Sequence, residues 1–243
     1  MTLPTSRAPL ITLTFLVICA LAGLFALSAN YNPSWGAGID FPRYHYPSVE
    51  LFRSSSFSVF MQDMPTASGP LYYVLMGLTP LDAHGVRVAT WALHLASTAL
   101  IVLLARRAMP EGPWAWGMAA AFYVSPFQLG PALWGHPEAL ATLMMVLAVW
   151  CREQGWHSLS SGLSATTITC RQTAIASLGD LGLKDLSAAR WAQLILKAAL
   201  ALGLIAWMYS HWHGLTPPKF QDHLAPNART FLVSVSLLAM ALT

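Results

Sequence analysis

Acidic and basic side chains are scarce in this sequence, so those that interrupt its apolar stretches are the first candidates for chemistry. Asp40 lies in a polar stretch from residue 30 to residue 68, close to His45. A carboxylate there could act as a general base on an acceptor hydroxyl group. It could also supply oxygen ligands to a divalent cation such as Mg²⁺ or Mn²⁺. A helix cap or a solvated loop charge is the structural alternative for the same residue.

Arg171 is the second candidate, because it interrupts an apolar stretch between residues 158 and 178. A charge within a membrane helix is costly and needs a partner. A guanidinium group pairs with phosphate oxygens in bidentate geometry, which makes a phosphate a natural partner. Gln172 and Thr173 would add neutral donors to the same group. The alternative is that the Arg171 side chain only extends to the membrane interface.

His136 and Glu138 form a third candidate group, on either side of Pro137. They lie at the start of an apolar stretch, and we expect them to face the same compartment as Asp40. They could bind substrate there. A carboxylate in the first turn of a helix also interacts favourably with the helix dipole, so a structural role for Glu138 is the alternative.

The composition indicates a membrane protein. Apolar residues make up 56% of the 243 residues and charged residues only 9%, against about 25% charged in a soluble domain. The formal net charge of +3 does not indicate nucleic-acid binding. Cys19, Cys151 and Cys170 lie in or beside apolar stretches, so no disulfide framework or metal–cysteine site is indicated.

The apolar residues fall into runs that reach or approach the length of a transmembrane helix, about 20 residues. The runs cover residues 9–29, 86–105, 114–134, 137–150, 158–178 and 191–209, and a partial run begins at residue 230. We therefore expect an all-α fold, a polytopic transmembrane helical bundle with about six spans plus a partial C-terminal one. Residues 1–243 would form a single membrane domain. The third run is expected to leave the helix near Pro126.

A long outer loop is expected over residues 30–85, with short interfacial helices. Its segment 69–80 is apolar but too short to span, which favours a re-entrant or interfacial helix with Tyr72 and Tyr73 at headgroup level.

Basic residues in the short loops predict the orientation. If successive runs cross the membrane in alternating directions, one face carries Arg7, Arg106, Arg107 and Arg152. That face is predicted to be the cytoplasmic one. The loop 30–85 and the turn before Glu138 would then share the outer face. The same alternation places Lys184 and Arg190 outside.

The order of these landmarks resembles the polyprenol-phosphate-dependent membrane glycosyltransferases of the GT-C class, from about residue 9 to residue 178. One span is followed by an outer loop that contains an acid. The motifs that carry the resemblance are Ser-Gly-Pro-Leu-Tyr-Tyr (68–73), the arginine pair 106–107, Ser-Pro (125–126) and Gly-His-Pro-Glu-Ala-Leu (135–140). Thr66 and the sequence Arg-Gln-Thr at 171–173 are similar to motifs of the alpha-1,2-glucosyltransferases that act on lipid-linked oligosaccharides.

The resemblance implies a hexosyltransferase that uses a polyprenyl-phosphate-linked sugar. The sequence shows no eukaryotic retention tail, which favours a bacterial inner membrane. Asp40 would be the catalytic residue, and His45 would take the place of a neighbouring acid that several members have. Glu138 would be the second-loop acid, with His136 where Gln is usual. The group 171–173 would bind substrate. Members of the class are much longer, so the resemblance covers only the N-terminal part of such a module.

The alternative function is a non-catalytic multi-pass membrane protein that binds or transports a phospholipid or a polyprenyl-phosphate lipid. In that case Arg171 and Arg87 would bind a lipid phosphate in a cavity. Membrane lipid is a partner in both interpretations, whereas chemistry at Asp40 belongs only to the first.

Overall fold

All regular structure in the described part of the chain is helical. The computed structural model describes residues 8–28, 37–110, 113–171, 188–213 and 217–218. Within these ranges the expected all-α fold is confirmed. The partial run from residue 230 lies outside the described residues, as do Gln172 and Thr173.

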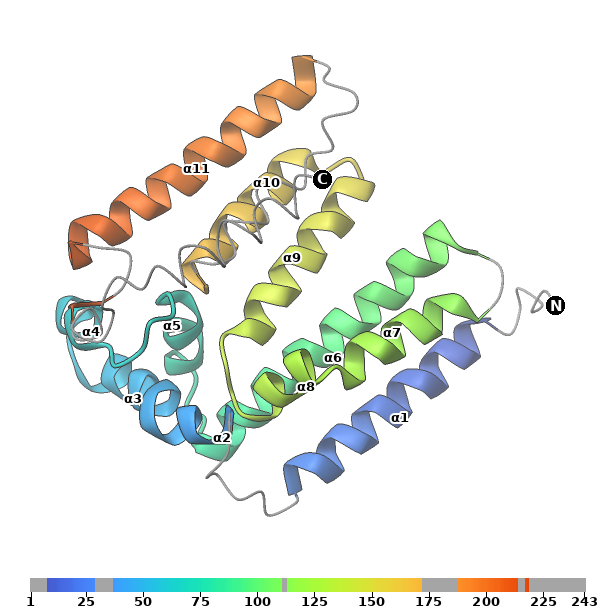
Figure 1. Ribbon diagram of the computed structural model, residues 1–243, viewed down its shortest axis with the longest axis horizontal. Coiled ribbons are helices and arrows are strands. Elements are labelled where there is room, and N and C mark those ends of the chain that lie inside the picture. The colour runs from blue at the N-terminus through green and yellow to red at the C-terminus, as the bar shows by residue number, and fades with distance from the viewer. Residues whose placement is uncertain (1–7, 29–36, 111–112, 172–187, 214–216, 219–243) are drawn as a thin grey trace, which may run out of the picture.

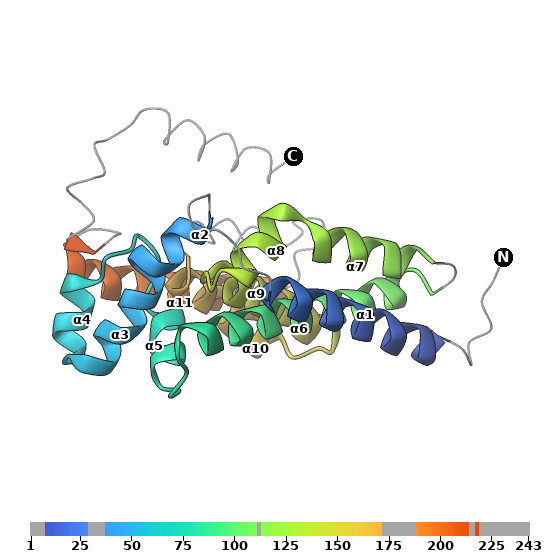
Figure 2. The same ribbon diagram turned by 90° about the horizontal axis from the view of Figure 1, so that it is seen from below.

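The long helices run side by side, and the short helices α2 to α5 gather at one end of them (Figure 1). Figure 2 shows α3, α4 and α5 at that end, beside the C-terminal end of α11. In chain order the elements are α1 (Ala8–Ser28), α2 (Ala37–Asp40), the π-helix η2 (Phe41–His45), α3 (Tyr46–Ser54), α4 (Phe57–Asp63), α5 (Leu71–Gly77), α6 (Ala83–Ala108), α7 (Trp114–Val124), α8 (Pro126–Leu133), α9 (Glu138–Glu153), α10 (His157–Thr166), the 3₁₀-helix η3 (Thr167–Thr169) and α11 (Ala188–Trp212).

Three of the described helices are long and apolar enough to cross a membrane. They are α1, α6 and the part of α11 from Ile195 to Trp212. Their outward side chains are largely apolar, including Leu21 and Phe25 on α1, which are 62% and 77% exposed. Such faces need an apolar environment, which indicates a multi-pass membrane protein.

The expected run 114–134 is divided at Ser125 into α7 and α8. Ser125 leaves the helical conformation with ψ of 125°, and Pro126 begins α8. A residue before proline is disfavoured in helical conformation because its backbone clashes with the proline ring. The prediction of a helix break near Pro126 is therefore confirmed.

The expected continuous helix over residues 158–178 is wrong. The α-helix α10 ends at Thr166, and the chain tightens into the 3₁₀-helix η3. The hydroxyl groups of Thr166, Thr167 and Thr169 donate to backbone carbonyls three or four residues earlier, at 2.7, 2.5 and 2.6 Å. Such local bonds compete with the regular helix pattern. Arg171 therefore follows the end of a helix and does not lie inside one.

The direction of α11 also differs from the simple alternation of spans. The indole Nε1 of Trp212, at its C-terminal end, donates to the carbonyl oxygen of Met61 on α4 at 2.6 Å. The end of α11 therefore lies with the short helices, and its start at Ala188 lies at the opposite end of the bundle (Figure 1). The alternation of spans placed Arg190 at the end of the bundle that carries the loop 30–85, whereas the structure places the start of α11 at the other end; Lys184 lies outside the described residues.

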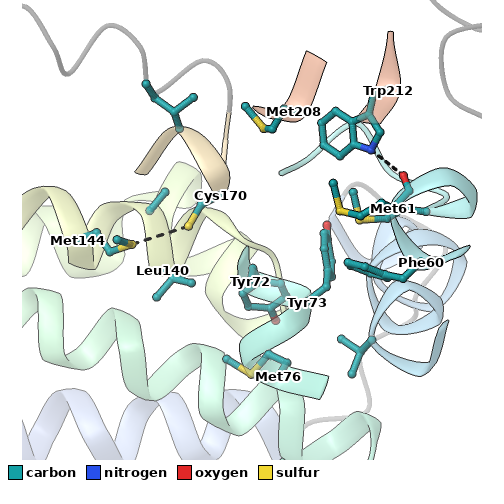
Figure 3. Close-up of a cluster of buried hydrophobic side chains, with 14 of the residues drawn as sticks. Phe60, Met61, Tyr72, Tyr73, Met76, Leu140, Met144, Cys170, Met208 and Trp212 are labelled. Atoms are coloured by element: carbon teal, nitrogen blue, oxygen red, sulfur yellow. Dashed lines mark hydrogen bonds between the residues drawn. The ribbon is translucent and has the colours of Figure 1, made fainter. Parts of the chain in front are cut away.

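Tyr72 and Tyr73 are core residues and do not lie at an interface. Both side chains are 0% exposed in α5, where aromatic rings, methionines and Trp212 from α4, α9 and α11 surround them (Figure 3). The expected short helix in the segment 69–80 is present as α5, but its tyrosines face the protein. Their hydroxyl groups instead find partners inside, as buried tyrosines usually do.

Arg53 fixes the loop helices against one another. Its guanidinium donates to the carbonyl oxygens of Met76, Thr79 and Leu81 at 3.2, 2.7 and 2.8 Å, and it forms an ion pair with Glu50. These carbonyls follow or end α5, where helix C-termini leave acceptors unsatisfied. The stretch 37–85 is therefore a packed helical subassembly that holds α3 against α5.

Candidate functional site

A polar cavity of about 190 Å³ lies where the loop helices meet the end of the bundle. Four separate parts of the chain line it: the α2–η2 region, the segment before α5, the turn between α8 and α9, and the stretch after η3. The lining residues are Asp40, Tyr44, His45, Thr66, Ala67, Ser68, His136 and Arg171. The expectation that the loop and the turn before Glu138 lie at the same end is confirmed.

His45 is a buried titratable group of the cavity wall, with an exposed fraction of 5%. Its Nδ1 lies 2.7 Å from the hydroxyl oxygen of Tyr73, and that hydroxyl donates to Thr66 Oγ1 at 3.2 Å. With the tyrosine proton directed at Thr66, His45 carries its own proton on Nδ1 and donates it to Tyr73. A relay of three side chains thus runs from the cavity wall into the core.

The surroundings of His45 disfavour its charged form. Burial lowers the pKa of His45 well below its ordinary value, and the nearby His136 and Arg171 lower it further. The two imidazole rings have centroids 4.2 Å apart. His45 is therefore neutral near pH 7, and its Nε2 is left as an acceptor.

Glu138 lies behind the cavity wall, between two lining residues. One carboxylate oxygen forms an ion pair with the guanidinium of Arg171, and the other lies 3.7 Å from Nδ1 of His136. That second oxygen, Oε2, is buried without a hydrogen-bond partner among the described residues. Glu138 thus holds Arg171 and His136 in place.

Asp40 and Arg171 are the oppositely charged groups of the cavity wall. Asp40 ends α2 and is half-buried. Burial lowers the pKa of Arg171, whereas the charge on Asp40 acts in the opposite direction. The cavity therefore combines a carboxylate, which accepts protons, with a guanidinium, which binds anions.

A backbone contact places Arg171 beside the segment before α5. The N–H of Gly69 donates to the carbonyl oxygen of Cys170 at 3.0 Å. A Cβ atom at Gly69 would lie only 2.1 Å from the carbonyl oxygen of Thr169. Glycine is therefore needed for this close approach, and the contact holds Arg171 next to Thr66.

The turn before α9 is joined to the loop in a similar way. Gly135 has a φ of +66°, and a Cβ atom there would lie 2.3 Å from the ring of Phe41. Its carbonyl oxygen accepts a hydrogen bond of 2.7 Å from the hydroxyl of Tyr72. His136, the next residue, is thereby fixed against the loop helix that carries His45.

The structure brings together most of the residues predicted from the sequence, although they are spread over more than a hundred positions. Those at the cavity or directly behind it are Asp40, His45, His136, Glu138 and Arg171. The partner of His45, Tyr73, was not predicted for the site. The sequence signal that could have indicated Tyr73 is its place in a short apolar helix that follows the hydroxyl residues Thr66 and Ser68.

Arg87 and His94 lie away from this cavity and have structural contacts. Arg87 Nε donates to the carbonyl oxygen of Leu133 at 2.8 Å, and its guanidinium carbon lies 4.3 Å from the ring centroid of Trp134. His94 Nε2 lies 3.1 Å from the carbonyl oxygen of Tyr123. The prediction that Arg87 binds a lipid phosphate in the candidate cavity is not supported by this placement.

The side chains around the cavity do not form a ready set of metal ligands. Among the residues that the structure describes, no three His, Cys, Asp or Glu side chains are grouped so that they could hold a metal ion. The carboxylate of Glu138 is already engaged by Arg171.

No known protein family model, curated protein or solved structure matches this chain. A proposal for its function therefore rests on the fold, the cavity and the motifs of the sequence.

Proposed function

We propose that this protein is a membrane glycosyltransferase that moves a hexose from a polyprenyl-phosphate donor to an acceptor hydroxyl group. The observation that carries the proposal is the presence of Asp40 and Arg171 in the wall of one cavity, at one end of a helical membrane bundle. Such a transfer needs a base for the acceptor and a cation for the leaving phosphate. The order of the family-like motifs supports the same function.

The reaction follows from the two charges. The Asp40 carboxylate takes the proton of the acceptor hydroxyl while the acceptor oxygen bonds to the anomeric carbon of the sugar. The bond between that carbon and the phosphate oxygen breaks, and the polyprenyl phosphate leaves with the electron pair. Arg171 stabilises the charge that develops on the phosphate, which is the type of interaction that contributes most in such sites.

Further residues support these two groups. Glu138 keeps the guanidinium of Arg171 in place, so that little reorganisation is needed when charge develops. The neutral His45 and its neighbour His136 line the same cavity and orient the sugar by hydrogen bonds. Gln172 and Thr173, which follow Arg171 directly, remain predicted donors to the phosphate.

The membrane arrangement gives the lipid donor access to the cavity. We propose that α7 with α8, α9 and α10 are further membrane segments beside the three long helices, which gives the six-segment bundle expected from the sequence. The lipid chain of the donor lies along the bundle and its phosphate reaches Arg171. The cavity faces the outer side of a bacterial inner membrane, because the arginine-rich helix ends lie at the other end.

The test is turnover of a radiolabelled polyprenyl-phosphate hexose by the purified full chain in detergent, with a mixture of acceptor lipids. The decisive variant is Asp40→Asn, and Asp82→Asn is the matched control, because Asp82 is an exposed helix cap at the start of α6. Loss of a general base reduces the rate by about 10²–10⁴-fold. Equal rates in Asp40→Asn and in the control would refute the role of Asp40.

A second function, binding of a lipid phosphate without chemistry, is favoured by the placement of Arg171 between a cavity and a supporting carboxylate. Donor binding is therefore measured beside turnover, with Arg171→Gln as the variant. Binding without turnover in the native chain, lost in Arg171→Gln, would establish a lipid-binding protein instead of a transferase.

A further inference from the structure

A second, apolar cavity lies at the other end of the bundle. Its volume is about 290 Å³, and it is formed by the last turns of α6 together with α7 and α9. The residues that line it are Ile101, Leu104, Ala105, Ala108, Met109, Met118, Val146 and Val149. All of them are apolar, so the cavity offers no group for polar chemistry.

This second cavity, called the groove below, is distant from the candidate active site. Thr90, on the same helix α6, bonds to Tyr72 beside the polar cavity. Ala105 lies about 22 Å further along α6, at 1.5 Å per residue. The groove therefore does not hold the sugar end of a substrate that is bound at Asp40.

Two arginines, Arg106 and Arg107, lie between the groove-lining residues Ala105 and Ala108 at the end of α6. The guanidinium carbon of Arg106 is 5.6 Å from the ring centroid of Trp116 on α7, and that of Arg107 is 4.3 Å from the ring centroid of Trp150 on α9. Each tryptophan lies next to a wall of the groove. Both guanidinium groups thus lie over aromatic rings, in the arrangement of a cation–π contact.

The arginines are only partly satisfied by the protein. The buried Nε of Arg106 has no hydrogen-bond partner among the described residues. The side-chain oxygen of Gln154 accepts from Arg107 when its amide is turned toward the guanidinium. Each guanidinium has five N–H groups, so donors remain on both arginines for further acceptors.

We propose that this groove is a binding site for an anionic phospholipid of the inner leaflet. One acyl chain occupies the apolar groove, and the lipid phosphate lies between Arg106 and Arg107. The arginines lie at the end of the bundle that the basic residues assign to the cytoplasm. Basic pockets between transmembrane helices on that side suit anionic headgroups.

The headgroup, and not the acyl chain, determines the preference among lipids. Phospholipids with the same acyl chains gain equally from the groove, so the acyl chain does not discriminate between them. A basic residue near an anionic surface contributes a factor of about five in affinity. Each arginine should therefore favour an anionic lipid over a zwitterionic one by about fivefold.

The experiment is native mass spectrometry of the full chain with phosphatidylglycerol and with phosphatidylcholine of the same acyl chains. We expect phosphatidylglycerol to bind with at least fivefold preference, and the double variant Arg106→Gln/Arg107→Gln to lose that preference. Arg43→Gln, an exposed arginine at the other end of the bundle, should keep it. Equal binding of the two lipids by the native chain, or unchanged preference in the double variant, would overturn the proposal.

A second measurement tests the groove itself and does not depend on the arginine variants. Val149→Trp fills the groove, and it should weaken binding of long-chain phosphatidylglycerol at least fivefold. Soluble glycerophosphoglycerol, which has the headgroup without acyl chains, should bind far more weakly than the intact lipid. Binding of the headgroup alone as tightly as the lipid would show a free-phosphate site and would refute the lipid assignment.

Discussion

Tyr73 allows the buried relay behind His45 to be tested by removing a single oxygen atom. In Tyr73→Phe the ring stays and no cavity forms. The hydroxyl that bridges His45 Nδ1 at 2.7 Å and Thr66 Oγ1 at 3.2 Å is lost. Burial raises the pKa of Tyr73 to about 12. The hydroxyl is therefore protonated throughout the usual pH range, and the native relay is intact in the assay.

The size of the effect follows from the two contacts. A buried neutral hydrogen bond contributes about 0.5–1.5 kcal/mol net, so the loss of two should destabilise the chain by about 1–3 kcal/mol. For a chain of this length, each kcal/mol lowers the melting temperature by about 2–4 °C. The expected decrease for Tyr73→Phe is therefore about 2–12 °C.

The assay is thermal unfolding of the purified chain in detergent, followed by tryptophan fluorescence. Tyr209→Phe is the matched control, because Tyr209 on α11 is 56% exposed and surface changes alter stability by less than about 0.5 kcal/mol. A melting temperature of Tyr73→Phe that equals that of Tyr209→Phe would show that the relay contributes nothing. The reasoning about His45 would then be refuted.

The same site predicts two further effects on stability. Because burial lowers the pKa of His45 in the folded chain, the unfolded chain binds more protons below about pH 6.5, so stability should fall there as the pH falls. His45→Gln should flatten that decrease in a pH series of melting temperatures; an unchanged slope would contradict it. Gly135→Ala should lower the melting temperature, because Gly135 has a positive φ and an added Cβ atom would meet the ring of Phe41. Gly162→Ala is the control and should not lower it, because the space around Gly162 is open. Equal melting temperatures of the two variants would contradict this prediction.

The apolar runs of the sequence predicted the long helices well, because a length of about 20 apolar residues has few other uses. α1 and α6 begin and end within three residues of the expected ranges. The prediction of one continuous helix over residues 158–178 failed, because a hydropathy pattern does not show which hydroxyl groups bond to the backbone. The hydroxyl of Thr167 bonds to the carbonyl of Ser164, and this local competition ended a helix that hydropathy alone would continue.

The ionisable residues of the site could be predicted from the sequence, but the residues that hold them in place could not. Asp40, His136 and Arg171 stand out because charge is rare in this chain. The hydroxyl of Tyr73 does not stand out, since a tyrosine fits both a membrane interface and a core. Only the packing of α5 against α4 and α9 decides between these positions, and that packing depends on segments far apart in the sequence.

The contact between Gly69 and Cys170 determines which sequence changes the site can accept. Two chain segments about a hundred positions apart meet there by a backbone hydrogen bond of 3.0 Å, not by side chains. One inserted residue displaces an extended chain by about 3.3 Å, which is enough to separate donor from acceptor. The lengths of the two segments that meet at this contact must therefore stay constant over evolution.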